Sequence, residues 1–271
     1  GVNYLPAFEK DATDRNRTSP FAFTGNKFEF RMVGSNDSIA CANTILNSIV
    51  AESFAEASDY IEKAEDKDLA AHDLIKRYAA EHQRVVFNGN GYSAEWVEEA
   101  TRRGLPNLPT MVDAIPSMVS DKAVAMFEKL GVFTKEELEA RAEIRYESYV
   151  KQLNIEARAM LNIANKQIIP AAISYTTKLA ESLTAVQSAC PEADVSVQKK
   201  LLMESSSLLA DIKAADIALE DVLAGASGIE DIVAEAHYFK DTILPAMDAL
   251  RAPVDTLEMT MDKKMWPYPS Y

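Results

Sequence analysis

Cysteine and histidine are scarce in this sequence, which has two cysteines and three histidines among 271 residues. Cys41 and Cys190 cannot build a disulfide framework, and neither lies in a CxxC or a Cys/His cluster with metal-ligand spacing. His72, His82 and His237 lack the i, i+4 spacing with which two histidines on one helix share a metal. We therefore interpret the histidines as structural and expect a reducing, cytoplasmic location.

Long apolar runs are also missing, since no segment approaches the roughly 20 residues that span a bilayer. The opening segment, "GVNYLPAFEK", lacks the basic and apolar regions of a signal peptide. Positive charge is in deficit, with 28 Lys and Arg against 42 Asp and Glu and a net charge of -14. These features argue against membrane and nucleic-acid partners, although a local cationic pocket could still hold a small anion.

What the sequence does contain is helical periodicity. Apolar residues at i, i+3 and i+4 predict a long amphipathic helix from about residue 36 and another helix over 67–86. Ser93 is predicted to cap a short helix with the sequence "AEWVEEATRR". "NGNGYS" lacks the full GxGxxG pattern, so we interpret it as a turn. "GLPNLPTMVDAIP" has three prolines and is predicted to be an ordered connector.

The second half predicts three long helices. A capping box formed by Thr134 and Glu137 opens an apolar stripe, and Pro170 is expected to kink or break that helix before it resumes. Ser227 with Glu230 predicts a second capping box, at the start of the last helix. This pattern is typical of an up-and-down bundle. No Glu-x-x-His pair points inward, so we interpret it as a scaffold or assembly surface.

The densest chemistry lies in "DRNRTSPFAFTGNKFEFR", residues 14–31. As a strand, "KFEFR" sends Lys27, Glu29 and Arg31 to one face and Phe28 and Phe30 to the other. Glu29 could then offer an oxygen ligand to a divalent metal while the cations hold anionic groups beside it. The alternative is a solvated charge ladder on an antiparallel sheet, which the alternation alone favours.

Two more cations, Arg15 and Arg17, precede this strand. Four cations and one carboxylate within the seventeen residues 15–31 are an unusual balance in a chain this acidic, which shifts the interpretation toward an anion site.

The run "TDRNRTSPFAFTGNKFEFRMVGS" resembles the glutamine synthetases of the long type III class. The resemblance continues through "NTILNSIVAES", "VVFNGNGYSAEWVEEATRRGLPNLPT" and "WPYPSY", so it covers essentially the whole chain. It implies a mainly α chain in which a short β lead-in from the catalytic domain is followed by long antiparallel helices forming a bundle. The expected domains are the end of a catalytic domain (1–66), a helical connector region (67–133) and a long-helix bundle with its C-terminal tail (134–271).

The resemblance also implies a reaction. Glutamine synthetases use ATP to phosphorylate the side-chain carboxylate of glutamate, and ammonia then displaces phosphate from this glutamyl phosphate. Divalent Mg²⁺ or Mn²⁺ and several cations are needed to neutralise the phosphate charge. Family enzymes assemble as homo-oligomeric rings with active sites between neighbouring subunits. The expected partners are therefore glutamate, ammonia, ATP and further copies of the parent chain.

Carried over residue by residue, the resemblance assigns Glu29 as a metal ligand and Arg31 to the substrate glutamate. Arg17 matches the arginine that contacts the phosphoryl group, and Lys27 matches a nucleotide-side basic residue more weakly. Ala22 stands where the more distant bacterial class has a second phosphate-contacting arginine, so that contact must come from elsewhere.

The family's remaining metal ligands and ammonia-side residues lie upstream of the "NR" element, and only thirteen residues precede Asp14 here. We therefore expect this chain to be the C-terminal portion of a longer glutamate-ammonia ligase and to be inactive alone. The alternative is a non-catalytic helical module for oligomerisation.

Overall fold

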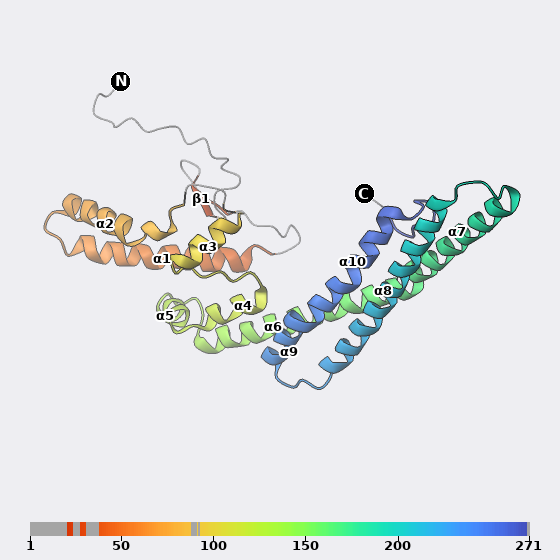
Figure 1. Ribbon diagram of the computed structural model, residues 1–271. Helices are drawn as coiled ribbons and strands as arrows, with labels where there is room; N and C mark the ends of the chain where they lie inside the picture. Colours follow the sequence, from red (N-terminus) through yellow and green to blue (C-terminus); the bar gives the residue numbers. More distant parts are fainter. Residues whose placement is uncertain (1–20, 24–27, 31–37, 88–90, 92, 270–271) are drawn as a thin grey trace, which may run out of the picture. The chain divides into compact units, whose positions relative to one another are not determined.

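The computed structural model describes residues 21–23, 28–30, 38–87, 91 and 93–269 (Figure 1). The described chain is predominantly helical, as the sequence predicts. It divides into two compact units, the first containing residues 1–109 and 121–134 and the second containing residues 110–120 and 135–271. No helix in the described ranges is long and apolar enough to cross a membrane. The predicted domain boundaries at 66/67 and 133/134 stay a prediction.

The first unit contains four α-helices and a 3-10 turn within the described residues. They are α1 (Ala40–Glu62), α2 (Lys67–Glu81), η2 (Gln83–Val85), α3 (Ala94–Arg102) and α5 (Asp121–Lys129). Asp66 caps α2 by accepting a hydrogen bond from the Leu69 backbone N–H. Ser93 caps α3 in the same way, accepting from Trp96 N–H, which confirms the predicted cap.

Two glycines end helices in the first unit. Gly104 has φ 70° and Gly131 has φ 65°, a left-handed conformation that a side chain would strain. After each glycine the chain folds back, so that the N–H of Leu105 donates to Ala100 O and the N–H of Val132 donates to Phe127 O, both at 2.9 Å. These bonds satisfy carbonyls at the ends of α3 and α5 that would otherwise lack a partner.

Two three-residue strands are also present, β1 (Phe21–Phe23) and β2 (Phe28–Phe30). They pair antiparallel, with Ala22 opposite Glu29. Two strands of three residues each do not form a sheet layer. The predicted β lead-in from a catalytic domain is therefore not seen in the described residues.

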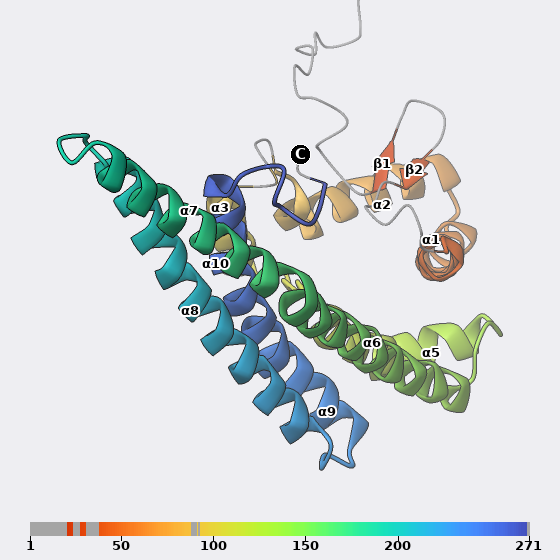
Figure 2. The ribbon, with the colours of Figure 1, turned by 90° about the vertical axis from the view of Figure 1, so that its right-hand side faces the viewer.

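The second unit is built from long helices that run side by side (Figure 2). Its elements are α4 (Met111–Ala114), η3 (Ile115–Val119), α6 (Lys135–Ile163), η4 (Ala164–Ile168), α7 (Ile169–Ala189), α8 (Ser196–Ala226), α9 (Ile232–Tyr238), η5 (Phe239–Ile243) and α10 (Leu244–Thr260). The predicted arrangement of three long helical runs is confirmed, because α6 to α7 and α9 to α10 are each continuous. Their apolar stripes meet in one core, where Ala157, Ile212, Leu219 and Ile243 have no exposed surface.

Of the two outcomes expected at Pro170, a kink or a break, the break does not occur, because α6, η4 and α7 follow one another without a gap. The segment before the proline, η4, is a π-helical turn in which the Ile169 N–H donates to Ala164 O, five residues back. A second π-helical turn, η5, precedes Pro245, and there the Leu244 N–H donates to Phe239 O. A proline clashes with the carbonyl four residues back in a regular α-helix, and the wider turn relieves that clash.

The prediction of a capping box at Ser227 and Glu230 is wrong. Helix α8 runs on to Ala226, and Ser227 follows it as the C-cap residue. Asp231 caps the next helix instead, since its carboxylate accepts a hydrogen bond from Ala234 N–H at 2.7 Å. The "GLPNLPTMVDAIP" connector is likewise more structured than expected, because α4 and the start of η3 form within it.

Candidate functional site

Most of the residues that the sequence predicts for the site lie outside the described residues. This applies to Arg15, Arg17, Lys27 and Arg31. Glu29 is the exception, because its backbone lies in β2 and pairs with Ala22. Within the described ranges no group of three or more His, Cys, Asp or Glu side chains could hold a metal ion. The predicted metal and substrate roles therefore stay predictions.

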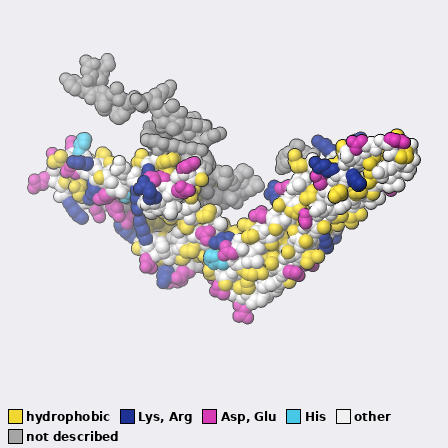
Figure 3. Space-filling model, viewed as in Figure 1, with side chains coloured by type: hydrophobic (Ala, Val, Ile, Leu, Met, Phe, Trp, Pro, Cys, Tyr) yellow, Lys and Arg dark blue, Asp and Glu magenta, His cyan; other side chains and the backbone are white. Residues whose placement is uncertain are grey.

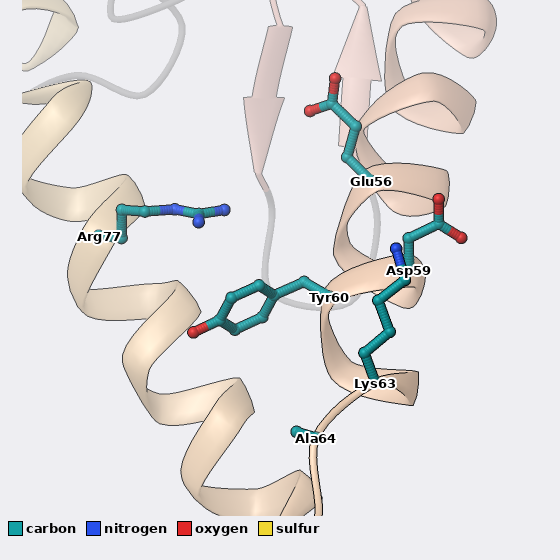
Figure 4. Close-up of a pocket in the computed structure, with 6 residues that line it drawn as sticks. All are labelled: Glu56, Asp59, Tyr60, Lys63, Ala64 and Arg77. Carbon is teal, nitrogen blue, oxygen red and sulfur yellow. The ribbon is translucent and has the colours of Figure 1, made fainter.

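One pocket lies between α1 and α2 and has a volume of about 590 Å³ (Figure 4). It is lined by Glu56, Asp59, Tyr60, Lys63, Ala64 and Arg77. Arg77 and Tyr60 point toward each other across the pocket, with the guanidinium carbon 4.9 Å from the ring centre. This cation-π contact joins the two helices. Glu56 and Asp59 point in different directions, so their carboxylates do not converge on one ligand (Figure 4).

A second pocket, of about 350 Å³, lies where η2 and the end of α3 meet. Its lining is Gln83, Arg84, Val86, Glu99, Arg102 and Arg103. We call it the arginine pocket. Figure 3 shows Lys and Arg side chains beside acidic ones over the part of the first unit that holds α3.

Glu99 organises one wall of the arginine pocket. Arg102 donates to both of its carboxylate oxygens at 2.7 Å, and Arg103 donates from Nε to Oε1 at 2.5 Å. These bonds from Arg102 and then Arg103 lower the pKa of Glu99 to about 2, so the carboxylate stays charged at neutral pH.

Arg103 is also fixed from the other side. Its Nη1 donates to the carbonyls of Arg84 at 3.1 Å and Val86 at 2.7 Å, which joins η2 to α3. The guanidinium lies 5.5 Å from the ring centre of Trp96. That ring stacks on Phe87 with a centroid distance of 4.1 Å, so Trp96 packs against both the guanidinium and a second aromatic ring.

Arg84 differs from the other two arginines, because no hydrogen bond or ion pair joins its side chain to the residues that the structure describes. Sequence reasoning did not single out this pocket. The i, i+3 and i, i+4 spacing of Glu99, Arg102 and Arg103 was a visible signal for the ion pairs. The packing of η2 against α3 has no such signal in the sequence, because the two elements are not related by a helical spacing.

Comparison with known proteins defines the class. Residues 70–187 match the family model described as the glutamine synthetase C-terminal domain. Those residues run from α2 into α7 and include the arginine pocket. This helical region is thus a C-terminal domain of the glutamine synthetase family.

The relatives extend this result to the full length of the chain. It is 36% identical over 281 residues to the type-3 glutamine synthetase of Dictyostelium discoideum, with 100% of this chain and 38% of that protein covered. It is 33% identical over 279 residues to a glutamine synthetase of Bacteroides fragilis, again with 100% and 38% covered. For a glutamine synthetase of Butyrivibrio fibrisolvens the identity is 37% over 280 residues, with 97% and 38% covered.

The suspected resemblance is therefore confirmed: the chain corresponds to the C-terminal part of type-3 glutamine synthetases. It spans 38% of the length of these curated relatives.

Proposed function

We propose that this chain is the C-terminal part of an ATP-dependent glutamate-ammonia ligase that makes glutamine through a glutamyl phosphate intermediate. The observation that carries the proposal is the 36% identity to a type-3 glutamine synthetase over 100% of the chain, a length that includes the cation-rich opening segment. The balance of charge in that segment supports the proposal, because ATP, glutamate and an acyl phosphate are all anions.

In this proposal Arg17 binds the phosphoryl group, Arg31 binds the glutamate substrate and Lys27 lies on the nucleotide side. Glu29 binds the divalent metal, Mg²⁺ or Mn²⁺, which neutralises phosphate charge when bound. A carboxylate is the oxygen donor that such a metal prefers, so the residue type fits. One carboxylate is not a complete site, and the described residues offer no group of three ligands. The remaining ligands would come from other parts of a longer polypeptide.

The test is release of ADP that depends on glutamate, ammonium and Mg²⁺ together, measured for a longer polypeptide that contains this chain. We expect Glu29→Gln to lower turnover by more than about a hundredfold, because a metal ligand is lost. Glu192→Gln changes an exposed carboxylate in the turn between α7 and α8, and this control should keep full activity. Intact turnover with Glu29→Gln would refute the assigned role.

The same assay on the 271-residue chain addresses its sufficiency. We expect no turnover above background, because the described residues offer no group of three metal ligands. Activity of this chain alone would mean that other carboxylates within it hold the metal.

A second candidate function is assembly, in which the second unit forms contacts between copies in a homo-oligomeric ring. Its support is the set of apolar side chains that the long helices leave exposed, among them Ile144 at 60%, Ile155 at 64% and Met203 at 68%. Light scattering on a longer polypeptide, with and without residues 134–250, would test it. An unchanged oligomer after the deletion would count against an assembly role.

A further inference from the structure

We infer that the arginine pocket is a binding site for a small oxyanion of the phosphate class. The inference does not rest on the proposed ligase activity, because the pocket is formed by described residues of η2 and α3 and uses none of the residues assigned to that reaction.

The arginine pocket carries a local excess of positive charge. Arg84, Arg102 and Arg103 bring three positive charges against the single negative charge of Glu99, which leaves two in excess. The C-terminal end of α3 also lies here and contributes a partial charge of about -0.5, which does not cancel the excess. The whole chain carries a net charge of -14, so its general field repels anions. A local positive excess of this size is therefore a property of the pocket itself.

The arginine pocket also holds hydrogen-bond donors that are not used within the described structure. A guanidinium has five N–H groups in a planar fork that matches phosphate oxygens. Arg102 gives Nε and one N–H of Nη2 to Glu99, which leaves Nη1. Arg103 uses Nε and Nη1, which leaves Nη2. The Arg84 fork makes no bond to the described residues, and Gln83 adds a side-chain amide to the lining.

Two of the three arginines are held in place by other groups of the protein. Arg103 is held by the Glu99 carboxylate, two backbone carbonyls and the Trp96 ring, and its side chain is only 24% exposed. Its orientation is fixed before a ligand arrives, so binding costs little conformational entropy at this residue. Arg102 is more exposed, at 74%, but both of its bonds to Glu99 orient its fork. Glu99 remains charged because its pKa is about 2, so this support persists at neutral pH.

The shape of the anion matters here, because the volume of about 350 Å³ accommodates a free phosphate ion as well as the phosphate end of a larger ester. A tetrahedral oxyanion presents several acceptor oxygens in different directions, whereas a carboxylate presents two in one plane. Three separate guanidinium groups therefore match the tetrahedral anion.

Isothermal titration of the 271-residue chain with inorganic phosphate, against sodium chloride at equal ionic strength, tests the inference. We expect saturable binding of phosphate and no saturable response to chloride. Arg84→Ala and Arg102→Ala should each weaken phosphate binding by about tenfold or more, the loss expected for a charge-assisted hydrogen bond. Absence of saturable phosphate binding, or unchanged affinity in both variants, would overturn the site.

The control is Arg77→Ala, which removes an arginine from the other pocket, where the side chain lies over Tyr60. It should bind phosphate like the unaltered chain, and an equal loss would mean that phosphate responds to overall charge only. Arg84→Lys keeps the charge but loses the fork, so we expect an intermediate affinity and a fold as stable as the original.

Two further ligands define the chemical class. Acetate should bind at least about tenfold more weakly than phosphate, and equal binding would overturn the phosphate assignment. ADP distinguishes a phosphate ester from the free ion. Tighter binding of ADP than of phosphate, lost in Arg84→Ala, would assign an ester, whereas weaker binding would assign free phosphate.

Discussion

Lys240 Nζ donates a hydrogen bond to Asp113 Oδ1 at 2.7 Å and so joins two residues 127 positions apart in the sequence. Lys240 lies in the π-helical turn η5, and Asp113 lies in the short helix α4. Thr110 donates from its hydroxyl to the other Asp113 oxygen at 2.5 Å and accepts from the Asp113 backbone N–H at 3.2 Å. Together with buried Val112 and Ile115, this pair holds residues 110–120 in the second unit.

Lys240→Met should lower the melting temperature of the chain, because Asp113 loses the donor that contributes most to lowering its pKa. A group with a depressed pKa stabilises the fold above its ordinary pKa, here 3.8, and that contribution is lost as pH falls through the folded value. The difference in melting temperature between Lys240→Met and the unaltered chain should therefore be constant from about pH 5 to pH 8. It should become smaller below about pH 4.

Thermal unfolding monitored by circular dichroism between pH 3 and pH 8 measures this difference in melting temperature. Lys200→Met is a suitable control, because Lys200 forms an exposed pair with Glu204 on α8, at 3.7 Å. It should shift the melting temperature little at any pH. If the loss in melting temperature caused by Lys240→Met does not change with pH, the ionised Asp113 carboxylate is not the source of the stabilisation.

Glu99→Gln should loosen the junction between η2 and α3, since Arg102 and Arg103 both lose a charged acceptor. The folded pKa of about 2 lies below the ordinary value of 4.5, so the stabilising contribution is complete above about pH 4.5 and disappears toward pH 2. Thermal unfolding from pH 7 to pH 2.5 should show a lower melting temperature for the variant at neutral pH. This difference in melting temperature should become smaller as the pH falls. Glu98→Gln, at an exposed neighbouring position, should show no such closing difference.

Gly225→Ala should destabilise the second unit even though alanine is the better helix former by about 1 kcal/mol. A Cβ at this position would lie 2.8 Å from Tyr238 Oη, and that hydroxyl donates to Val222 O at 2.9 Å. The ring must shift and the bond is lost, so we expect a net loss of about 1–2 kcal/mol in the free energy of unfolding. Chemical denaturation gives this value.

The matched test adds Tyr238→Phe, which removes the hydroxyl. Gly225→Ala should then become neutral or stabilising relative to Tyr238→Phe alone. Gly228→Ala is the control for a glycine with nothing within 4 Å of the added Cβ, and it should be tolerated. If Gly225→Ala costs the same with and without the hydroxyl, the clash is not the cause.

Asn165→Ala should lower the free energy of unfolding by about 1–3 kcal/mol, because a buried carboxylate loses a donor. Asp216 on α8 has no exposed surface, and Asn165 Nδ2 donates to its Oδ1 at 2.7 Å. Lys213 Nζ donates to Asp216 Oδ2 at 2.7 Å and to Asn165 Oδ1 at 2.9 Å.

A double variant, Asn165→Leu with Asp216→Leu, should be less destabilised than Asn165→Ala, since no buried carboxylate is then left without its donor. Asn154→Ala removes an exposed acceptor of Arg158 and should change stability by less than about 0.5 kcal/mol. Chemical denaturation of these variants measures the coupling. Equal losses for Asn165→Ala and the double variant would contradict it.

The sequence predicts the helices well where an apolar stripe or a cap fixes them locally. Ser93 shows this, because the hydroxyl and the N–H that it accepts from are three residues apart. The prediction of a capping box at Ser227 and Glu230 is wrong because Asp231, the residue after Glu230, caps the helix instead. Such competition between neighbouring capping residues is decided by where α8 ends, and packing along the whole bundle determines that end.

The arginine pocket shows the other limit of sequence reasoning. Glu99 and Arg103 are close in the sequence, but Arg84 and Val86 come from a different element and meet them only when η2 packs against α3. The predicted residues Arg17, Lys27 and Arg31 lie outside the described residues, and Glu29 is described only as part of β2. The resemblance to glutamine synthetases implies their roles, and the Glu29→Gln assay tests one of them.

The π-helical turns η4 and η5 have a consequence for how this domain tolerates change in length. Each adds one residue to a turn, so the helix on one side of it is rotated by about 100° relative to an uninterrupted helix. The apolar face of α6 is thereby aligned independently of that of α7, and the same holds for α9 and α10. Removing one residue from η4 would restore a regular helix, turn one of the two faces away from the core and place Pro170 where a carbonyl obstructs it. Each π-helical turn thus sets the rotation of one helix about its axis relative to the next. Its extra residue cannot be deleted without repacking one of the two helices.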